Sequence, residues 1–409
     1  MSQEVLSLTS KFVSTPGGFT SLREQAPLVR VTLPDVETPV WLLTRYEDAK
    51  AALTDPRFVR DNRKLPGEDG PSIADQMIEA YGLPAEYRDY LGILVLADGE
   101  DHTRMRTLIT RAFTARRINA LRPKIEKITH DLYAAMAAKG EADLLEDLSH
   151  PLAGFGVCEL IGVDAADQPQ ICAWIRDYIS GDPERFIPAL KGMVEHCKKL
   201  IEERTAALSD DLISELIRVS QEEGDFGETE IVAIFLLLIN TGIMPPAHFI
   251  ADAILALLDH PDQLARLREE PELLAGRAVP ELLRFTTPVP IGAPMYATED
   301  LELGGMPVKQ GEVVTAALVG VNHDPREFPG GADKLDIGRE LGRGVGHMAF
   351  GHGPHFCIGA ALARLQAEVV LETLFVRNDG LTLAVDREAL EYVAMPGDGI
   401  HLVSLPVRL

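Results

Sequence analysis

Cysteine is scarce in this chain of 409 residues: the four are Cys158, Cys172, Cys197 and Cys357, and no two of them form a CxxC pair. Their spacing excludes a disulfide framework and offers no zinc-ligand pattern. The first three lie in helical stretches, where a small buried thiol is an ordinary packing residue. Cys357 differs, because it lies in a glycine-rich segment.

Basic residues are also few, with 39 Lys and Arg against 63 Asp and Glu, so the formal net charge is -24 at pH 7. Nucleic acids and anionic lipids carry the same sign, which excludes non-specific binding to either. No basic-then-apolar signal opens the sequence, and the longest apolar run, residues 231–239, is too short to span a bilayer. We expect a cytoplasmic protein with no membrane segment and no nucleic-acid partner.

Repeats, low-complexity segments and linkers are missing as well, so we expect one domain over residues 1–409. Apolar residues recur at helical spacing over residues 47–54, 121–138, 189–208 and 211–222. Alternating apolar residues predict short strands within residues 28–45, 304–324 and 380–405. The predicted fold class is mainly α with a minor β portion. Glycine, proline and charge in residues 61–98 predict a mobile loop that could cover a site.

Cys357 lies in a bend just before an amphipathic helix, in FGHGPHFCIGAALARLQAEV, residues 350–369. A cysteine at a helix N-terminus lies near free N–H groups and the positive end of the dipole, which lower the thiol pKa. Glycines in the bend let the backbone approach a flat ligand closely. Two aromatic side chains, Phe350 and Phe356, are placed to keep water from the sulfur.

This segment resembles the haem-binding loop of cytochromes P450. The matching positions are Phe350, Gly353, His355, Cys357, Gly359, Leu362, Ala363 and Arg364. The resemblance implies the cytochrome P450 fold as a single haem-binding domain, with haem b as cofactor and dioxygen as co-substrate. It makes the Cys357 thiolate the axial ligand of the iron, within the haem loop of residues 350–359. It also assigns haem contacts to Gly351 and Ile358.

The tetrapeptide ELLR, from Glu281 to Arg284, resembles the family's Glu-x-x-Arg helix. The two side chains meet one helical turn apart and tie into the segment before the cysteine loop, which gives them a structural role. Residues 41–58 and 321–328 also resemble family segments, so the resemblance covers nearly the whole chain.

His102 and Arg106 lie one turn apart in HTRMR and resemble the family pair that holds the haem propionates. Further along, Met295 stands where the family usually has a propionate-binding arginine. We therefore expect the propionates to be held by His102, Arg106 and His355 with help from His347, and haem retention to be weaker.

Residues 230–260 resemble the long distal helix on the oxygen side of the haem. In the catalytic segment of that helix, Thr241, Gly242, Met244 and Pro245 stand where the family carries Ala, Gly, an acid and an alcohol. The acid and alcohol deliver protons during oxygen activation in relatives, and both are missing. Pro245 and Pro246 remove two backbone donors and predict a kink with free carbonyls.

Three other groups are candidates for proton supply. The first is the Thr241 hydroxyl, although an ordinary helix threonine bonded to a preceding carbonyl explains it equally well. The second is a substrate hydroxyl or a water held by the free carbonyls. The third is His248, which is more typical of a structural histidine.

The resemblance implies a bacterial-type, soluble monooxygenase that oxidises a small, largely apolar substrate in natural-product or antibiotic biosynthesis. One alternative uses the same haem for oxidative coupling, rearrangement or peroxide-driven chemistry, and a further alternative is a non-catalytic haem-binding or sensor protein. Substrate contacts are expected from Leu94, Val95, Leu96, Asn240, Thr241, Met244, Val289, Pro290, Ile291 and Met395.

Eight basic residues lie between His102 and Lys127, against the single acid Glu126. In the family this region borders the face below the cysteine, where acidic ferredoxins dock, so it predicts docking of a separate ferredoxin supplied by an NAD(P)H-dependent ferredoxin reductase. A solvated helix face is the other explanation. We expect a monomer.

Overall fold

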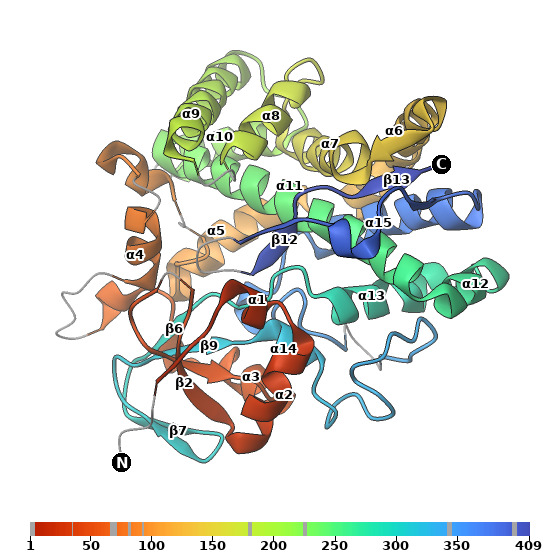
Figure 1. Cartoon of the computed structure of the whole chain (residues 1–409). Helices are drawn as coiled ribbons and strands as arrows, with labels where there is room; N and C mark the ends of the chain where they lie inside the picture. The colour runs from red at the N-terminus through yellow and green to blue at the C-terminus, as the bar shows by residue number, and fades with distance from the viewer. Residues whose placement is uncertain are drawn as a thin grey trace.

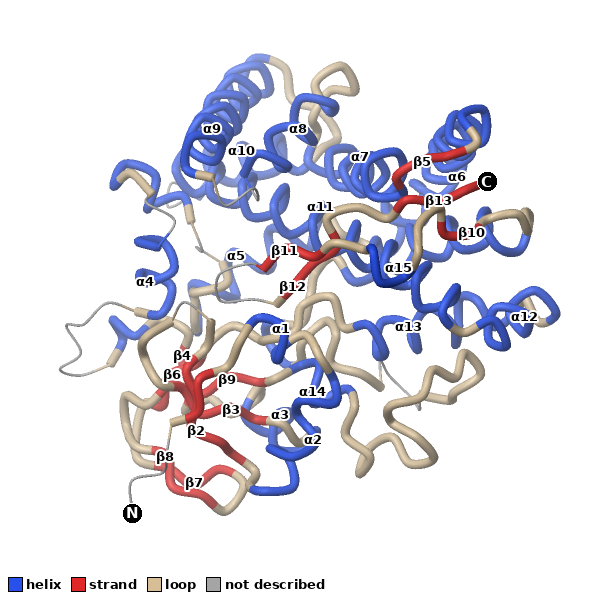
Figure 2. Tube along the Cα trace, in the orientation of Figure 1, coloured by secondary structure: helices blue, strands red, loops and turns tan. Residues whose placement is uncertain are grey.

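The computed structural model describes residues 5–34, 36–65, 72–80, 83–91, 94–178, 182–223, 227–341, 346–394 and 399–409. Most of the described chain is helical, and the largest sheet lies at one end of the molecule (Figure 1 and Figure 2). The described chain begins in this sheet, while the C-terminal strand lies among the helices. The prediction of a mainly α fold with a minor β portion is confirmed.

The helices follow one another through the whole chain. They are α1 (Ser10–Val13), α2 (Pro16–Gln25), α3 (Tyr46–Ala52), α4 (Ile73–Ala80), α5 (Gly99–Ala112), α6 (Ala115–Lys139), α7 (His150–Ile161), α8 (Gln168–Tyr178), α9 (Pro183–Ala206), α10 (Leu212–Glu223), α11 (Glu228–Asp259), α12 (Pro261–Glu269), α13 (Val279–Thr286), α14 (Leu318–Asn322) and α15 (Ala360–Leu371). Short 3-10 or π turns are η1 (Asn62–Lys64), η2 (Ala85–Tyr90), η3 (Leu145–Ser149), η4 (Leu274–Ala278), η5 (Gly353–His355), η6 (Glu372–Val376) and η7 (Arg387–Ala389).

The strands form one larger sheet and three small ones. They are β1 (Leu6–Ser7), β2 (Leu28–Thr32), β3 (Val40–Leu43), β4 (Phe58–Val59), β5 (Glu141–Asp143), β6 (Met295–Ala297), β7 (Leu301–Leu303), β8 (Met306–Val308), β9 (Val313–Ala316), β10 (Thr382–Leu383), β11 (Tyr392–Ala394), β12 (Ile400–Leu402) and β13 (Pro406–Arg408). The larger sheet has the order β1-β2-β3-β9-β6-β4, and the small sheets are β10-β13-β5, β11-β12 and β7-β8. The predicted hairpin in residues 28–45 is the antiparallel pair β2 and β3.

Helix boundaries follow local capping chemistry. α6 begins after Thr114, whose hydroxyl accepts a hydrogen bond from the Arg117 N–H at 3.3 Å, and it ends at Gly140 in a left-handed conformation. α11 begins where the Glu230 carboxylate accepts from the Gly227 N–H at 2.9 Å. α11 then continues through Pro245 and Pro246 without ending, so the prolines do not break this helix.

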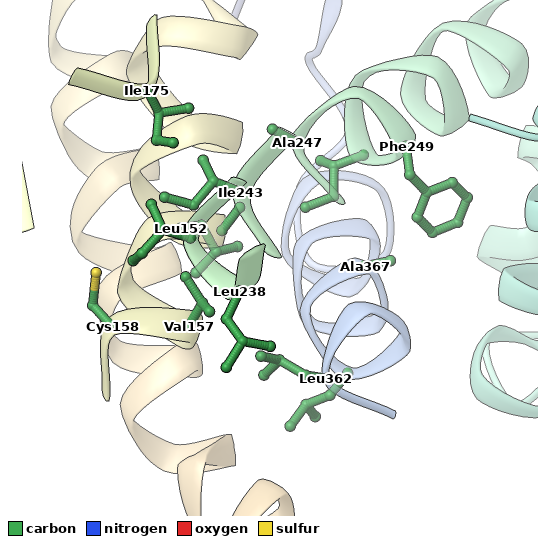
Figure 3. Packing of buried hydrophobic residues seen from close by; sticks show 14 of the residues in the cluster. Leu152, Val157, Cys158, Ile175, Leu238, Ile243, Ala247, Phe249, Leu362 and Ala367 are labelled. Carbon is green, nitrogen blue, oxygen red and sulfur yellow. The ribbon is translucent and has the colours of Figure 1, made fainter. Parts of the chain in front are cut away.

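α11 lies in the middle of the helical part and packs against α7, α8 and α15. Figure 3 shows buried side chains of these helices together, including Val157 from α7, Ile243 from α11 and Leu362 from α15. Length and composition alone would let α11 cross a membrane, but 67% of its most apolar window is buried inside the protein, as in the core helix of a soluble fold.

The segment of residues 61–98 is only partly a loop. Its described parts contain α4 and the turns η1 and η2, while residues 66–71, 81–82 and 92–93 lie outside the described chain. Apolar residues such as Ile73 and Leu83 explain this order, because each is buried against the rest of the protein.

Candidate functional site

The cysteine loop connects η5 to α15 and is held by backbone hydrogen bonds. The Cys357 N–H donates to the Phe350 carbonyl at 2.9 Å, and the thiol faces a cavity of about 340 Å³. The sulfur accepts hydrogen bonds from the backbone N–H groups of Gly359 and Ala360, as expected at a helix N-terminus.

The pKa of Cys357 is nevertheless raised in this structure, because withdrawal from bulk water outweighs those hydrogen bonds and the nearby cations. The backbone N–H groups at the helix N-terminus lower the pKa, as expected, but they do not outweigh the withdrawal from water. A bound metal ion is the group that deprotonates a coordinating thiol outright.

Gly353 explains how closely the loop approaches the end of α3. Its φ is +74°, and a Cβ at this position would lie 2.5 Å from the Leu53 carbonyl oxygen. Gly351 also has a positive φ of +70°. At Gly359, a Cβ would meet only the Cys357 sulfur within 4 Å, at 3.8 Å, so a flat ligand over the loop accounts better for this glycine than protein packing does.

Aromatic and apolar side chains complete the cysteine side of the cavity. Phe350 lines it and packs 6.1 Å from the Phe356 ring, and the Arg364 guanidinium lies 5.0 Å from the centre of the Phe350 ring. Ile358 and Ala363 line the same side. His347, by contrast, is not among the cavity-lining residues: it is buried, and its Nδ1 accepts from the Ala349 N–H at 3.2 Å.

One edge of the cavity gathers basic side chains. His102 and Arg106 project from α5, and the His102 and His355 rings lie 4.1 Å apart. Arg106 also donates to the Phe356 carbonyl. Arg60, which sequence reasoning missed, lies at the same edge, and no Asp or Glu lines the cavity in the part of the chain that is described.

These basic groups fit the two propionate carboxylates of haem. The buried Nε2 of His102 has no hydrogen-bond partner among the described residues, which leaves it available to a ligand. Burial, followed by the charges of Arg60, His102 and Arg106, lowers the pKa of His355 to about 3. A ligand that brings two negative charges would give the His102 Nε2 a partner and would offset the lowering of the His355 pKa.

The opposite wall of the cavity belongs to α11. Thr241, Gly242, Pro245 and Pro246 line it, and the Thr241 hydroxyl donates to the Leu237 carbonyl at 2.7 Å. This is the ordinary bond of a helix threonine, and it leaves the hydroxyl able to accept from the cavity.

Gly242 is explained by helix packing as well as by its place on this wall. A Cβ there would lie 2.8 Å from a Val157 methyl group, so glycine is what lets α7 approach α11 (Figure 3 shows Val157 beside this part of α11). Pro245 and Pro246 have no N–H, so the carbonyls of Thr241 and Gly242 lack their usual helical donors.

Several predicted residues do not reach the cavity in this structure. Asn240 and Met244 lie on other sides of α11, and Met244 packs against the hydrophobic core. His248 is buried against His150 and His401, at ring distances of 5.9 Å and 4.8 Å, and does not line the cavity either. The helical period explains these positions, because neighbouring residues point in directions about 100° apart.

Of the predicted substrate contacts, Leu94, Val95, Val289 and Ile291 line the cavity. Leu96 and Pro290 do not, and the Pro290 carbonyl instead accepts from the Val319 N–H at 3.2 Å. Met395 lies outside the described residues.

Glu281 and Arg284 are fully buried and joined by two hydrogen bonds of 2.7 Å and 2.8 Å. Arg339 adds a third member, with its Nε 3.1 Å from Glu281. Arg284 also donates to the carbonyls of Asn322, Ala332 and Lys334. This network fixes the segment that precedes the cysteine loop.

Comparison with known proteins agrees with this geometry. The sequence profile described as Cytochrome P450 matches residues 157–379. The chain is 37% identical over 372 residues to Cytochrome P450 107B1 of Saccharopolyspora erythraea, covering 90% of this chain and 89% of the relative. It is 35% identical over 375 residues to 6-deoxyerythronolide B hydroxylase of the same organism, covering 90% of each.

The crystal structure of the myxobacterial cytochrome P450 CYP267B1 in complex with myristic acid aligns with a TM-score of 0.85 and 32% identity, covering 97% of this chain and 96% of that chain. Fold, sequence and the cysteine facing a cavity with a basic edge thus agree, and the chain belongs to the cytochrome P450 family.

Proposed function

We propose that this cytochrome P450 monooxygenase inserts one oxygen atom into a small, largely apolar intermediate of natural-product or antibiotic biosynthesis. The observation that carries the proposal is the cavity between Cys357 and α11, whose lining is mainly apolar. Its substrate-facing wall includes Leu94, Val95, Val289 and Ile291. Such a lining favours an apolar ligand oriented by few polar groups.

The family implies haem held by a cysteine thiolate, with dioxygen as co-substrate. We propose haem b, with Cys357 as axial ligand and with His102, Arg106 and His355 at the propionates. The haem supplies the redox chemistry, and its thiolate ligand favours cleavage of the O–O bond. The protein holds the cofactor, orients the substrate and excludes water.

Thr241 is the protein group best placed to take part in proton supply. Its hydroxyl faces the cavity but donates to the Leu237 carbonyl, so it accepts a hydrogen bond from a water more readily than it gives a proton. The carbonyls of Thr241 and Gly242, which have lost their usual helical donors to Pro245 and Pro246, can hold the same water or a substrate hydroxyl. His248 is disfavoured as a source, because it points away from the cavity.

A second candidate function uses the same haem for oxidative coupling, rearrangement or peroxide-driven chemistry. The observation that favours it is the Met244-Pro245 pair, which supplies neither an acid nor an alcohol to the cavity. Labelled dioxygen separates the two functions. The monooxygenase proposal expects one labelled atom in the product under electron supply, and a converted product without label would contradict it.

Electrons would come from a separate ferredoxin and an NAD(P)H-dependent ferredoxin reductase, docking near α5 and α6. Part of the basic excess there is neutralised by the protein's own acids: Arg111, Arg117, Arg122, Lys124 and Lys127 form ion pairs with Glu215, Asp210, Glu368, Glu159 and Asp131. We therefore expect a moderate salt dependence of the reduction rate. A rate that does not change with ionic strength would contradict docking on this face.

We further propose a cytoplasmic monomer that folds as one domain.

A further inference from the structure

In the larger sheet, the arginine that follows β4 lies opposite the position in β6 where the family usually has a propionate-binding arginine. β4 and β6 are antiparallel, with Phe58 opposite Ala297 and Val59 opposite Tyr296. Continuing this register by one residue sets Arg60 opposite Met295. Met295, which stands where the family usually has a propionate-binding arginine, is 3% exposed and belongs to the hydrophobic core.

Arg60 is a buried cation that faces the cavity. Arg60 is 7% exposed, and it lines the cavity together with His102, Arg106 and His355. Its backbone N–H donates to the Asp98 carboxylate at 2.8 Å, which fixes the start of the loop after β4.

The guanidinium is held beside the position of the missing arginine. Its Nη1 donates to the carbonyls of Ala293 and Pro294, the second at 3.1 Å, immediately before Met295. The other donors, on Nε and Nη2, have no acceptor in the described chain. Buried arginines usually satisfy these donors, so a ligand carboxylate is the natural acceptor.

The charges around Arg60 support the same ligand. Burial lowers its pKa to about 10, and Asp98 opposes this shift only in part. Arg60 in turn is one of the charges that lower the pKa of His102. The repulsion between like charges at one buried edge is offset when an anion binds between them.

We propose that Arg60 is a haem propionate-binding residue that replaces, from the opposing strand, the cation lost at Met295. The inference rests on the haem site of the proposed function and extends it to a residue that the family pattern does not assign. On this proposal haem retention is not weakened by the loss at Met295, because Arg60 joins His102, Arg106 and His355 as a further basic side chain.

The competing explanation is that Arg60 only ties β4 to the carbonyls of Ala293 and Pro294. The two roles respond differently to the charge of the cofactor. A propionate-binding residue stabilises haem with free carboxylates but not haem whose carboxylates are esterified, whereas a structural tie affects both porphyrins alike.

The test measures haem loss from the holoprotein to excess apomyoglobin, with haem b and with its iron dimethyl ester. The variants are Arg60→Ala and Arg60→Lys, with Arg63→Ala as matched control, because Arg63 is three residues further on, exposed and paired with Asp61. Thermal unfolding of each holoprotein is recorded in parallel.

We expect Arg60→Ala to speed the loss of haem b roughly 10- to 100-fold, from the usual strength of a hydrogen bond to a charged group. The loss of the dimethyl ester should change less than threefold by the same reasoning, since its carboxylates carry no charge. Arg60→Lys should lie between Arg60→Ala and the unsubstituted protein, and Arg63→Ala should match the latter.

Equal acceleration for both porphyrins, or no acceleration for haem b, would overturn the proposal. If Arg60→Ala does not accumulate, Arg60→Lys gives the same comparison of the two porphyrins. Failure of the proposed function is recognised separately, because the unsubstituted protein would then bind no haem with a thiolate spectrum.

Discussion

The pair of Glu281 and Arg284 is the interaction whose loss should weaken this fold most. Both side chains are 0% exposed, and Arg284 makes five hydrogen bonds, two to Glu281 and three to backbone carbonyls. Arg284→Ala leaves a buried carboxylate with Arg339 as its remaining basic partner, and it leaves three carbonyls without this donor.

The magnitude follows from these contacts. Removing one partner of a buried ion pair costs about 3–5 kcal/mol, and each carbonyl that loses its donor adds about 1 kcal/mol or more. Water can enter the space left by the side chain and Arg339 still holds Glu281, so we expect about 5 kcal/mol in total. This is a third or more of the stability of a typical domain, about 5–15 kcal/mol.

Urea unfolding followed by far-ultraviolet circular dichroism measures the loss. Arg277→Ala is the matched control, because Arg277 pairs with Glu340 at 2.7 Å on the surface, where the side chains are 41% and 77% exposed. It should cost about 0–1 kcal/mol. A double variant, Glu281→Leu with Arg284→Leu, should cost less than the sum of the single variants, since no charge is left unpaired. If Arg284→Ala unfolds within 1 kcal/mol of the Arg277→Ala control, the account of this network is refuted.

Three further predictions concern the loop, the cavity and the pH. Gly353→Ala should lower haem occupancy severalfold, because a positive φ and a Cβ 2.5 Å from a carbonyl oxygen force the loop to move; occupancy equal to that of Gly351→Ala, which has only the φ penalty, would contradict this. Thr241→Val should raise the share of electrons lost as hydrogen peroxide while Thr241→Ser does not, and equal shares in both would remove the hydroxyl from proton supply. His150, His323 and His347 are among the histidines whose pKa burial lowers to about 3–4. Below pH 6.5 the unfolded chain therefore binds more protons than the folded protein at these sites, so stability falls as the pH drops toward 4. Asp252, whose pKa burial raises to about 7, offsets one proton, so unfolding takes up a net of at least two protons, and we expect a loss of at least about 2.7 kcal/mol per pH unit between about pH 6 and 5 in urea unfolding; a flat profile over this range would contradict it.

Local patterns were sufficient for helices such as α3, α6, α9 and α10, for the hairpin of β2 and β3, and for the cysteine loop. Each depends on residues close in sequence, such as the bend glycines or the one-turn spacing of Glu281 and Arg284. The same holds for His102 and Arg106, whose spacing places both at one edge of the cavity.

Long-range geometry explains what the sequence did not predict. Arg60 lies 235 positions before Met295, and only the pairing of β4 with β6 brings the two positions together. Asn240 and Met244 show that aligning a helical segment does not tell which of its side chains reach a cavity. A side chain one position from a cavity residue points elsewhere. The raised pKa of Cys357 depends on burial, which a motif does not report.

The central claim is that the Cys357 thiolate binds the haem iron, and the spectrum of the reduced carbon-monoxide complex tests it most directly. We predict that the unsubstituted protein gives the red-shifted Soret band of a thiolate-ligated haem and that Cys357→Ala loses it. Cys172→Ala, at a buried cysteine away from the cavity, should keep the band. A thiolate spectrum that survives Cys357→Ala would contradict the account.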